Sequence, residues 1–560
     1  MKKLLALILS LLIAVSLFGC AEKTDDATTT GDSNPENTAT PAAGTSSPEV
    51  KTTASTDDVK ENQLPIVSEP LTLTYFHYLD GKVSATMASN EEIRCYQEME
   101  KLTGIDIEWI HPPAGQEAEK LNLMIASYDL PDLIYTGWNG VPGGPHAMID
   151  NEVIIPLNEY IDQLAPDYSK IINDESNPDL YRQARLDDGT IYMFAQISSE
   201  GHRINQSSLQ YRQDWLDALG IENVPATIDD WEEVYKLVKE TDLNGNGEKD
   251  ELPFCSYGTP NQWSYSFGVN AGTWSMDGDT VYYGPTSDAA REYLTYMNRW
   301  YTEGLLDKEY IVTDGDALNT KITGERGFSY WGILSANLGT YQSAFNKTNP
   351  EAKLAGAPYP KADDGYQYRP VASYIGGSGT AITTACKHVE EAAKWLNFAY
   401  TEQGHNLIIF GVEGESYEWV DGYPKFKDVV TNNPDGLTFA QALSRFSCGS
   451  FSGAYVKDQR QFEQAVLTYD EQRQAFEAMQ SGNVSDAIFL PPITRTKEES
   501  ERYNEIMGEV DTYVKEMFDK FIMGSISLDE FDSFKAKVEN LGIEEARQLT
   551  QDAVDRYLGK

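Results

Sequence analysis

Hydrophobic and polar residues begin to alternate at Leu71, where the run LTLTYFHY over residues 71–78 predicts a first β-strand. A helical pattern follows over residues 91–103 and stops at Gly104, after which residues 105–110 (IDIEWI) alternate again as a second strand. A helix over residues 117–127 and a strand at residues 133–135 repeat the pattern. The order strand, helix, strand, helix, strand predicts a parallel α/β sheet.

Ligands of such sheets bind outside the carboxyl ends of the strands, which here are residues 76–80 and 135–139. Further along, Thr227 is a candidate N-cap with Asp230 at the capping-box position, so a helix is expected to begin there in a second lobe. Helical patterns return at residues 288–301, at 389–400 and from 498 to the end. Residues 373–383 (SYIGGSGTAIT) predict a strand with a glycine-rich bend.

The first residues predict export. Lys2 and Lys3 precede an apolar run over residues 4–18, which has the form of a signal peptide and is too short for a comfortable membrane span. The run ends in Gly19 and Cys20, like a bacterial lipobox, in which the cysteine receives palmitate-type acyl chains and becomes the mature N-terminus. An ordinary signal peptide with an incidental cysteine is the alternative. Residues 20–69 are Thr, Ser, Ala, Asp, Glu, Asn and Pro with few bulky apolar side chains, so we expect a disordered tether.

The charge of the chain limits its partners. The 560 residues hold 88 Asp and Glu against 44 Lys and Arg, a formal net charge of −44 that repels phosphate backbones and anionic headgroups. Nucleic acid is therefore not an expected partner, and membrane contact is expected through the lipid anchor only. Beyond the signal peptide no apolar run approaches the ~20 residues that span a bilayer.

The other four cysteines are Cys95, Cys255, Cys386 and Cys448. They have no CxxC spacing, so no zinc site is predicted. They could form one or two disulfides in an exported protein, or they could be buried free thiols.

The loop over residues 242–251 has the spacing of a calcium loop. Asp242, Asn244, Asn246, Glu248 and Asp250 match positions 1, 3, 5, 7 and 9, and a glycine, residue 247, stands at the sharp turn. The twelfth position is a proline, residue 253, in place of the usual glutamate, so the loop is no complete EF-hand. We expect a structural calcium ion; a hydrated Asx/Gly turn is the alternative.

Sugars stack on aromatic rings and need a few fixed polar partners. Five tryptophans lie in glycine-rich or polar segments and are candidate platforms for sugar stacking: Trp138, Trp263, Trp274, Trp331 and Trp419. The alternative for each is an indole that is packed in the core or merely exposed. The candidate polar partners are Asn139, Arg203, Asn261, Gln262 and Tyr374.

Several passages resemble the extracellular solute-binding lipoproteins of carbohydrate ABC importers, in the long branch similar to alginate-oligosaccharide-binding proteins and to Gram-positive polysaccharide-importer lipoproteins. The likeness covers about residues 70–558 and rests on the order and spacing of residues 130–135, 212–220, 242–251, 411–414 with 421–422, 520–524 and 551–557.

The resemblance implies an α/β fold, a two-lobed periplasmic-binding-protein-like clamp with a ligand cleft between the lobes, crossed about three times by the chain. It also implies that Glu251 supplies the missing calcium carboxylate and that the protein is no enzyme. With the signal peptide at residues 1–19, we expect the first lobe at 70–210 and 372–410, and the second lobe, with a helical C-terminal part, at 211–371 and 411–560.

The expected function is capture of an extracellular oligosaccharide and its delivery to ABC permease subunits by a monomer anchored to the outer face of the cytoplasmic membrane. Two alternatives stay open. One is a secreted glycan-active lyase or hydrolase, since no GxSxG, HExxH or Walker motif is present but a carboxylate pair among 88 acids is not excluded. The other is a passive surface-adhesion lipoprotein.

Overall fold

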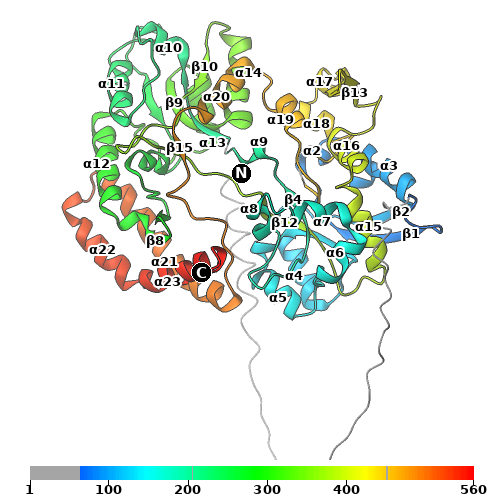
Figure 1. The fold of residues 1–560 in the computed structure, drawn as a ribbon. Coiled ribbons are helices and arrows are strands. Elements are labelled where there is room, and N and C mark those ends of the chain that lie inside the picture. Colours follow the sequence, from blue (N-terminus) through cyan, green and yellow to red (C-terminus); the bar gives the residue numbers. More distant parts are fainter. Residues whose placement is uncertain (1–63, 205, 450–451) are drawn as a thin grey trace, which may run out of the picture. The chain divides into compact units, whose positions relative to one another are not determined.

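The computed structural model describes residues 64–204, 206–449 and 452–560, which belong to one compact unit, residues 59–560. The predicted signal peptide, Cys20 and nearly all of the tether lie outside the described residues. Two separate sheets organise the described part (Figure 1). We call the elements around the first sheet the first lobe and those around the second sheet the second lobe.

The first sheet has the order β2–β1–β3–β12–β4, with β1 (Leu71–Phe76) paired in parallel to β2 (Ile105–Ile110) and to β3 (Leu133–Gly137). The helices α3 (Arg94–Thr103) and α4 (Glu117–Ser127) connect these strands, and Gly104 ends α3 in a left-handed conformation with φ +77°. The predicted parallel unit is therefore confirmed. Strand β12 (Ile375–Ile382), which comes from much later in the chain, lies between β3 and β4 (Phe194–Ile197) and is antiparallel to both. Its pairing with β4 has a register shift between Ile375 and Gly379.

The second sheet has the order β10–β5–β9–β6, formed by Leu354–Gly356, Ser207–Arg212, Gly327–Ile333 and Leu252–Cys255. The predicted capping box is present at the start of α11 (Ile228–Lys239): Asp230 N donates to Thr227 Oγ1 at 3.2 Å, and Thr227 N donates to Asp230 Oδ2 at 2.9 Å. The helix predicted at residues 288–301 is α12 (Asp288–Glu303).

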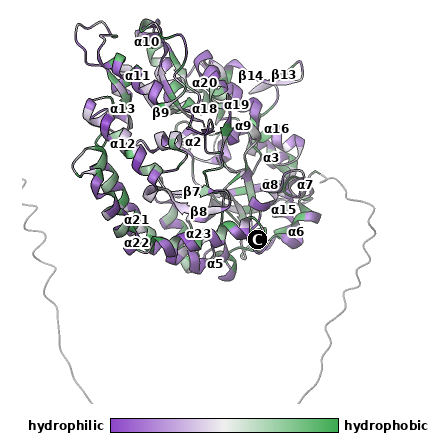
Figure 2. Cartoon of the chain, turned by 60° about the vertical axis from the view of Figure 1, so that its left-hand side comes forward, coloured by the Kyte–Doolittle hydropathy of each residue, from purple (hydrophilic) through white to green (hydrophobic). Residues whose placement is uncertain are grey.

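The helical tail predicted from residue 498 is also confirmed. Helix α21 (Lys497–Ile522) packs against α12 and against α23 (Ile543–Tyr557), and α22 (Phe531–Asn540) contacts α21 and α23. These helices turn buried apolar side chains such as Val510 and Phe521 toward the second lobe, and their outer faces are hydrophilic (Figure 2). Among the described residues, no helix combines the length and the apolar character that a membrane span requires.

Shorter elements complete the lobes. The first lobe includes α2 (Gly81–Ser84), α5 (Gly144–Asp150), α6 (Asn158–Leu164), α7 (Pro166–Ile172), α8 (Pro178–Gln183), α15 (Val389–Phe398), α16 (Glu402–Phe410), α17 (Asp428–Thr431), α18 (Phe439–Leu443) and the hairpin β13 (Tyr417–Val420)–β14 (Tyr423–Phe426). The second includes α10 (Gln213–Ala218), α13 (Gly315–Thr323), α14 (Thr340–Thr348), α20 (Asp470–Gln480), the hairpin β7 (Trp274–Asp277)–β8 (Thr280–Tyr283) and the pair β11 (Gln367–Tyr368)–β15 (Val484–Ser485).

The hydrophobic cores show where the chain changes lobes. The core of the first lobe continues past residue 410, through Tyr417, Phe426 and Leu443, to Tyr455. The predicted boundary at residue 410 differs from this, because the β13–β14 hairpin packs its aromatic rings on Phe410. In Figure 1 the yellow segments accordingly lie with the blue ones.

The chain crosses between the lobes in three segments that pair with one another. Ile204 bridges Val371, and Ile197 bridges Val456. Helix α9 (Glu200–Arg203) lies in the first crossing and is contacted by α19 (Gln459–Ala465), which follows the third. The two-lobed clamp with three crossings is thus the architecture that the family resemblance implies.

Candidate functional site

A pocket of about 370 Å³ lies between the two lobes. One wall comes from the first lobe: the α8 region, the loop after β3 and the residues that begin β12. The opposite wall comes from residues 492–494 and from the end of α23 in the second lobe. A ligand in this pocket therefore touches both lobes at once.

Asn139 lines this pocket from a position just beyond the carboxyl end of β3, where the strand pattern predicts ligand contacts. Its side chain lies close against Gly377 at the start of β12. Gly377 has φ +79°, and a Cβ atom there would stand 2.6 Å from Asn139 Nδ2. The positive φ favours glycine at this position, and a side chain there would also displace the Asn139 amide.

Polar contacts between the lobes border the pocket. Arg556 of α23 donates from Nε to Asp187 Oδ2 of the first lobe at 2.9 Å, and its Nη1 and Nη2 donate to Glu499 at 2.8 and 2.6 Å. Thr494 Oγ1 also donates to Asp187. Asp187 thus accepts from two segments of the second lobe and joins the lobes at the pocket rim.

Aromatic rings in the pocket come mainly from tyrosines. Tyr181 of α8 is 45% exposed, and the Arg185 guanidinium carbon lies 3.7 Å from its ring centroid. Arg182 lies 5.4 Å from the ring centroid of Tyr557 across the pocket. Rings and guanidinium groups of this kind can stack on the faces of a sugar and bind its hydroxyls.

Four of the five predicted tryptophan platforms are packing residues in this conformation. Trp138 is fully buried and donates from Nε1 to the Gly379 carbonyl oxygen at 3.0 Å, and Trp263 is fully buried beside other aromatic rings. Trp274 is 2% exposed and donates from Nε1 to Tyr503 Oη at 2.7 Å, while Trp331 is 7% exposed. An indole that is closed off in this way offers no free face to a sugar.

The remaining predicted residues lie apart from the pocket or at the crossings. Trp419 is 40% exposed on β13, outside the pocket lining. The Arg203 guanidinium carbon lies 3.7 Å from the ring centroid of Tyr374, and Arg203 Nε donates to the Ala372 carbonyl oxygen at 3.1 Å, so this pair joins the first and second crossings. Their contact with a ligand stays a prediction.

The loop over residues 242–251 is folded by its own side chains. Asp242 accepts from the backbone N–H groups of Asn246 and Gly247 at 3.1 and 2.9 Å. Asn246 Oδ1 accepts from Glu248 N at 2.7 Å, and Asn246 Nδ2 donates to Asp250 Oδ1 at 2.9 Å. This bond, with smaller contributions from Asn244 and the nearby Arg326, holds the pKa of Asp250 below its usual value against the opposing effect of burial.

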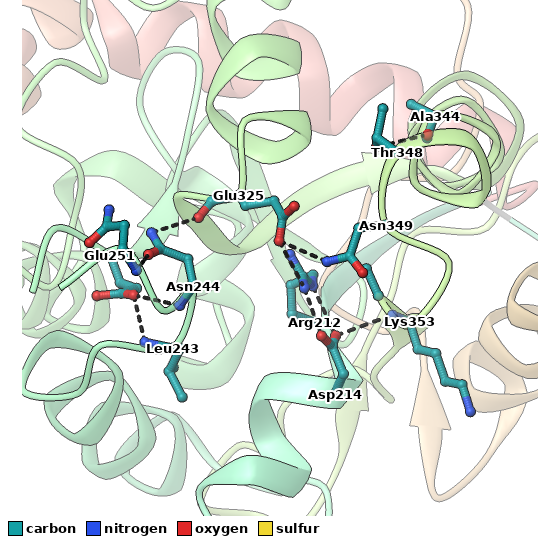
Figure 3. Close-up of polar contacts among 12 residues, drawn as sticks. Arg212, Asp214, Leu243, Asn244, Glu251, Glu325, Ala344, Thr348, Asn349 and Lys353 are labelled. Carbon is teal, nitrogen blue, oxygen red and sulfur yellow. Dashed lines mark hydrogen bonds and ion pairs between the residues drawn. The ribbon is translucent and has the colours of Figure 1, made fainter. Parts of the chain in front are cut away.

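Glu251 is the residue of this loop that is least satisfied by the protein. It is 5% exposed, and its Oε1 accepts from Leu243 N at 2.6 Å and from Asn244 N at 3.0 Å (Figure 3). Its Oε2 is buried and has no hydrogen-bond partner among the described residues. A buried carboxylate oxygen without a partner is costly unless a cation completes it.

The same loop is anchored to the second sheet. Asn244 Nδ2 donates to the Glu325 carbonyl oxygen at 3.1 Å, and Glu325 Oε2 accepts from Asn349 Nδ2 at 2.9 Å (Figure 3). Glu325 Oε2 also lies 3.8 Å from Nη2 of the buried Arg212 at the end of β5. Within the described residues no three Asp, Glu, His or Cys side chains converge as a metal site.

Residues 90–406 match the family model "Bacterial extracellular solute-binding protein", which is more than half of the chain. The chain belongs to this family. Its two-lobed α/β clamp is the fold of a solute-binding protein.

Among the relatives of this solute-binding protein is the fructooligosaccharide ABC transporter substrate-binding protein FusA of Streptococcus pneumoniae serotype 4, 24% identical over 488 residues, which cover 82% of this chain and 86% of FusA. Lipoprotein LipO of Bacillus subtilis strain 168 is 24% identical over 465 residues, covering 78% of this chain and 83% of LipO.

Two solved structures have the same fold. The alginate-binding protein AlgQ2, solved without calcium ion, superposes with a TM-score of 0.65 at 23% identity over 88% of this chain and 99% of AlgQ2. A FusA EF-hand mutant in complex with fructo-nystose superposes with a TM-score of 0.67 at 21% identity over 87% of this chain and 99% of FusA.

Several pocket residues of this solute-binding protein were not singled out by the sequence: Tyr181, Arg185, Asp187, Arg556 and Tyr557. Arg556 and Asp187 stand 369 positions apart, so no local pattern connects them. Tyr181 lies in a segment with a helical pattern, whereas the sugar platforms predicted from the sequence are tryptophans in loops.

Proposed function

We propose that this chain captures an extracellular oligosaccharide between its lobes and delivers it to the permease subunits of an ABC importer. The observation that carries this proposal is the pocket whose walls come from both lobes. A ligand that contacts both walls binds the closed arrangement better than an open one, and this difference in affinity is what shifts a clamp toward closure. A permease can distinguish the two states.

The pocket favours a sugar over a purely apolar ligand. Its lining joins the amide of Asn139 and the carboxylate of Asp187 with the exposed ring of Tyr181. Sugars need this combination, because their hydroxyls require directed polar partners and their C–H faces stack on rings. FusA, a relative over most of the chain, is described as fructooligosaccharide-binding, which supports a carbohydrate ligand without fixing the sugar.

The test is a thermal-shift screen of the full chain against a glycan panel, followed by calorimetric titration of the best glycan. A ligand at 100 times its dissociation constant should stabilise the folded protein by about 2.7 kcal/mol. Tyr181→Ala should weaken binding several-fold, since an aromatic contact contributes on the order of 1 kcal/mol. Tyr128→Ala is the matched control, a tyrosine that is 60% exposed outside the pocket lining, and should bind as wild type does.

Three outcomes contradict parts of this proposal. Equal affinities of wild type and Tyr181→Ala would remove this pocket as the glycan site. A product formed from the glycan during the titration would favour the alternative of a glycan-active lyase or hydrolase. Binding without any closure, measured by small-angle X-ray scattering with and without glycan, would favour passive adhesion.

The anchor is part of the same proposal. Gly19 and Cys20 follow an apolar run, and LipO, a relative over 78% of this chain, is named a lipoprotein. Two acyl chains on Cys20 would hold the protein stably at the outer face of the cytoplasmic membrane. Cys20→Ala should release it from the membrane fraction; retention equal to wild type would refute the anchor. Light scattering of the released protein tests the expected monomer.

We also infer a structural calcium ion on the loop over residues 242–251, held by Asp242, Asn244, Asn246, Glu248, Asp250 and Glu251. The unpartnered Glu251 Oε2 and the alternate oxygen donors support this, because Ca²⁺ prefers carboxylate, amide and carbonyl oxygens. A bound ion would fix the loop and its contact to Glu325. Chelation should lower the unfolding temperature, and elemental analysis should find calcium; an unchanged unfolding curve and no calcium would favour the hydrated turn.

A further inference from the structure

Two cysteines far apart in the sequence are brought together by backbone pairing in the first lobe. Arg94 N donates to the Arg445 carbonyl oxygen at 3.0 Å, and Cys95 N donates to the Phe446 carbonyl oxygen at 3.0 Å. The start of α3 is therefore docked along residues 445–446, two positions before Cys448. Cys448 is fixed in turn, because its N–H donates to the Ile408 carbonyl oxygen at 3.1 Å.

Cys95 and Cys448 are neighbours, and both are free thiols in this structure. The Cys95 thiol is within hydrogen-bond reach of the Cys448 side chain and of the Cys448 backbone. Cys95 is fully buried and Cys448 is 1% exposed, and both belong to the apolar core of the first lobe. Among the described residues this pair is not part of any cluster of three His, Cys, Asp or Glu side chains, so a metal does not account for it.

The other two buried cysteines lack such a neighbour. Cys255 belongs to a separate hydrophobic cluster in the second lobe, and Cys386 lies near Asp132 and accepts from the His388 backbone. The family of this chain is extracellular, and thiols in contact outside the cytoplasm meet no reducing glutathione pool.

We propose that Cys95 and Cys448 form a disulfide in the exported protein. Each thiol loses its hydrogen, the two sulfurs form one S–S bond, and the two electrons and two protons pass to an extracytoplasmic disulfide oxidant. The S–S bond of that oxidant breaks to give two thiols. The inference rests on the contact and on the extracellular family, not on the identity of the ligand.

The burial of the pair decides when the bond forms. Burial raises the pKa of the Cys95 thiol well above its ordinary value, and the thiolate is the form that attacks a disulfide. The exchange therefore takes place while α3 is still undocked, and a pair left unoxidised at docking stays reduced. Once formed, the bond closes a loop that contains most of the chain and ties α3 to the segment that leads into the third crossing.

The direct test is peptide mapping of the full chain, exported from a bacterial host and alkylated in denaturant without reductant. We expect Cys255 and Cys386 to be alkylated at once, and a cross-linked peptide pair containing Cys95 and Cys448 that separates only after reduction. Alkylation of Cys95 and Cys448 without reduction would overturn the proposal, and so would a cross-link of either residue to another cysteine.

A measurement of thermal stability tests the same bond in the wild type and in two variants. The unfolding temperature of the wild type should be several degrees lower after the protein is unfolded and refolded in excess reductant, because the loop-closure constraint is lost. Cys95→Ala should show no response to reductant, and the matched control Cys386→Ala, which removes another buried thiol of the same lobe, should respond as wild type does. Equal responses of wild type and Cys95→Ala would overturn the proposal.

Discussion

The Glu251→Gln substitution removes one charge from the loop over residues 242–251 and leaves the backbone contacts of that side chain in place. The amide oxygen of Gln can still accept from Leu243 N and Asn244 N, which donate to Glu251 Oε1 at 2.6 and 3.0 Å. The Oε2 atom that it replaces has no partner to lose within the described residues. In calcium-free solution the variant should therefore be as stable as wild type or more so, because a buried unpaired charge costs more than a buried unpaired amide.

With calcium present the order should reverse. An ion at 100 times its dissociation constant stabilises the wild type by about 2.7 kcal/mol. Loss of a residue that merely orients a metal ligand weakens affinity roughly 10–100-fold, and loss of a carboxylate ligand should cost at least as much. At the same ion concentration the variant would then gain about 1.4 kcal/mol for a tenfold loss and about 0.4 kcal/mol for a 100-fold loss.

The assay is chemical unfolding followed by circular dichroism, in chelator and at a fixed calcium concentration, with calorimetric titration of the ion. Glu240→Gln is the matched control: it removes the same charge beside the loop, where Glu240 is 70% exposed and lies 3.6 Å from Lys249 Nζ. This control should keep nearly the full response to calcium. The reasoning is refuted if Glu251→Gln responds to calcium as wild type does, or if the control loses as much as the variant.

Three further predictions concern the folded body. His77 is buried, and burial lowers its pKa to about 4. The neutral side chain therefore stabilises the fold by up to about 3 kcal/mol above the unfolded pKa of about 6.5, and this stability should be lost as pH falls toward 4. His77→Gln should flatten that part of the pH dependence of the free energy of unfolding, measured in urea. Trp138→Ala should cost about 3–5 kcal/mol in the same unfolding assay, because it empties a closed site and removes the donor to Gly379, whereas its effect on the affinity of the remaining folded protein for glycan should be small. Thr227→Ala should cost about 0.5–2 kcal/mol through the lost cap of α11, and Thr227→Ser should restore most of it.

Local pattern was enough to predict the elements that depend on neighbours in sequence. The strands at residues 71–76 and 105–110 alternate because one face of each packs on the core, and Gly104 between them ends a helix in a conformation that costs a glycine nothing. The capping box at Thr227 is a contact across three residues. A single sequence contains all the information that such features require.

The exposure of the tryptophan rings could not be predicted in this way. A glycine-rich segment around an indole is typical of a loop, but it does not indicate which distant residues cover the ring. Trp138 stands in the run TGWNG, yet β12 returns from more than two hundred residues away and places the Gly379 carbonyl oxygen 3.0 Å from its Nε1. Trp274 is covered by Tyr503 of α21 in the same manner. Long-range contacts decided the exposure of both rings, so the surface offered to a ligand was set by topology.

The pocket between the lobes follows the same logic and explains why its residues are inconspicuous in the sequence. Asp187 is one of 88 acidic residues, and Arg556 is one basic residue near the end of a predicted helix, so neither stands out in the sequence. Together they join the lobes at 2.9 Å, while Arg556 remains held by Glu499 on its own side. Because Glu499 fixes the guanidinium whether or not Asp187 is near, the lobes can separate without leaving Arg556 unpaired, and closure adds the contact to Asp187 without removing another. A ligand that contacts both walls would then have to supply only the free energy that orders the two lobes.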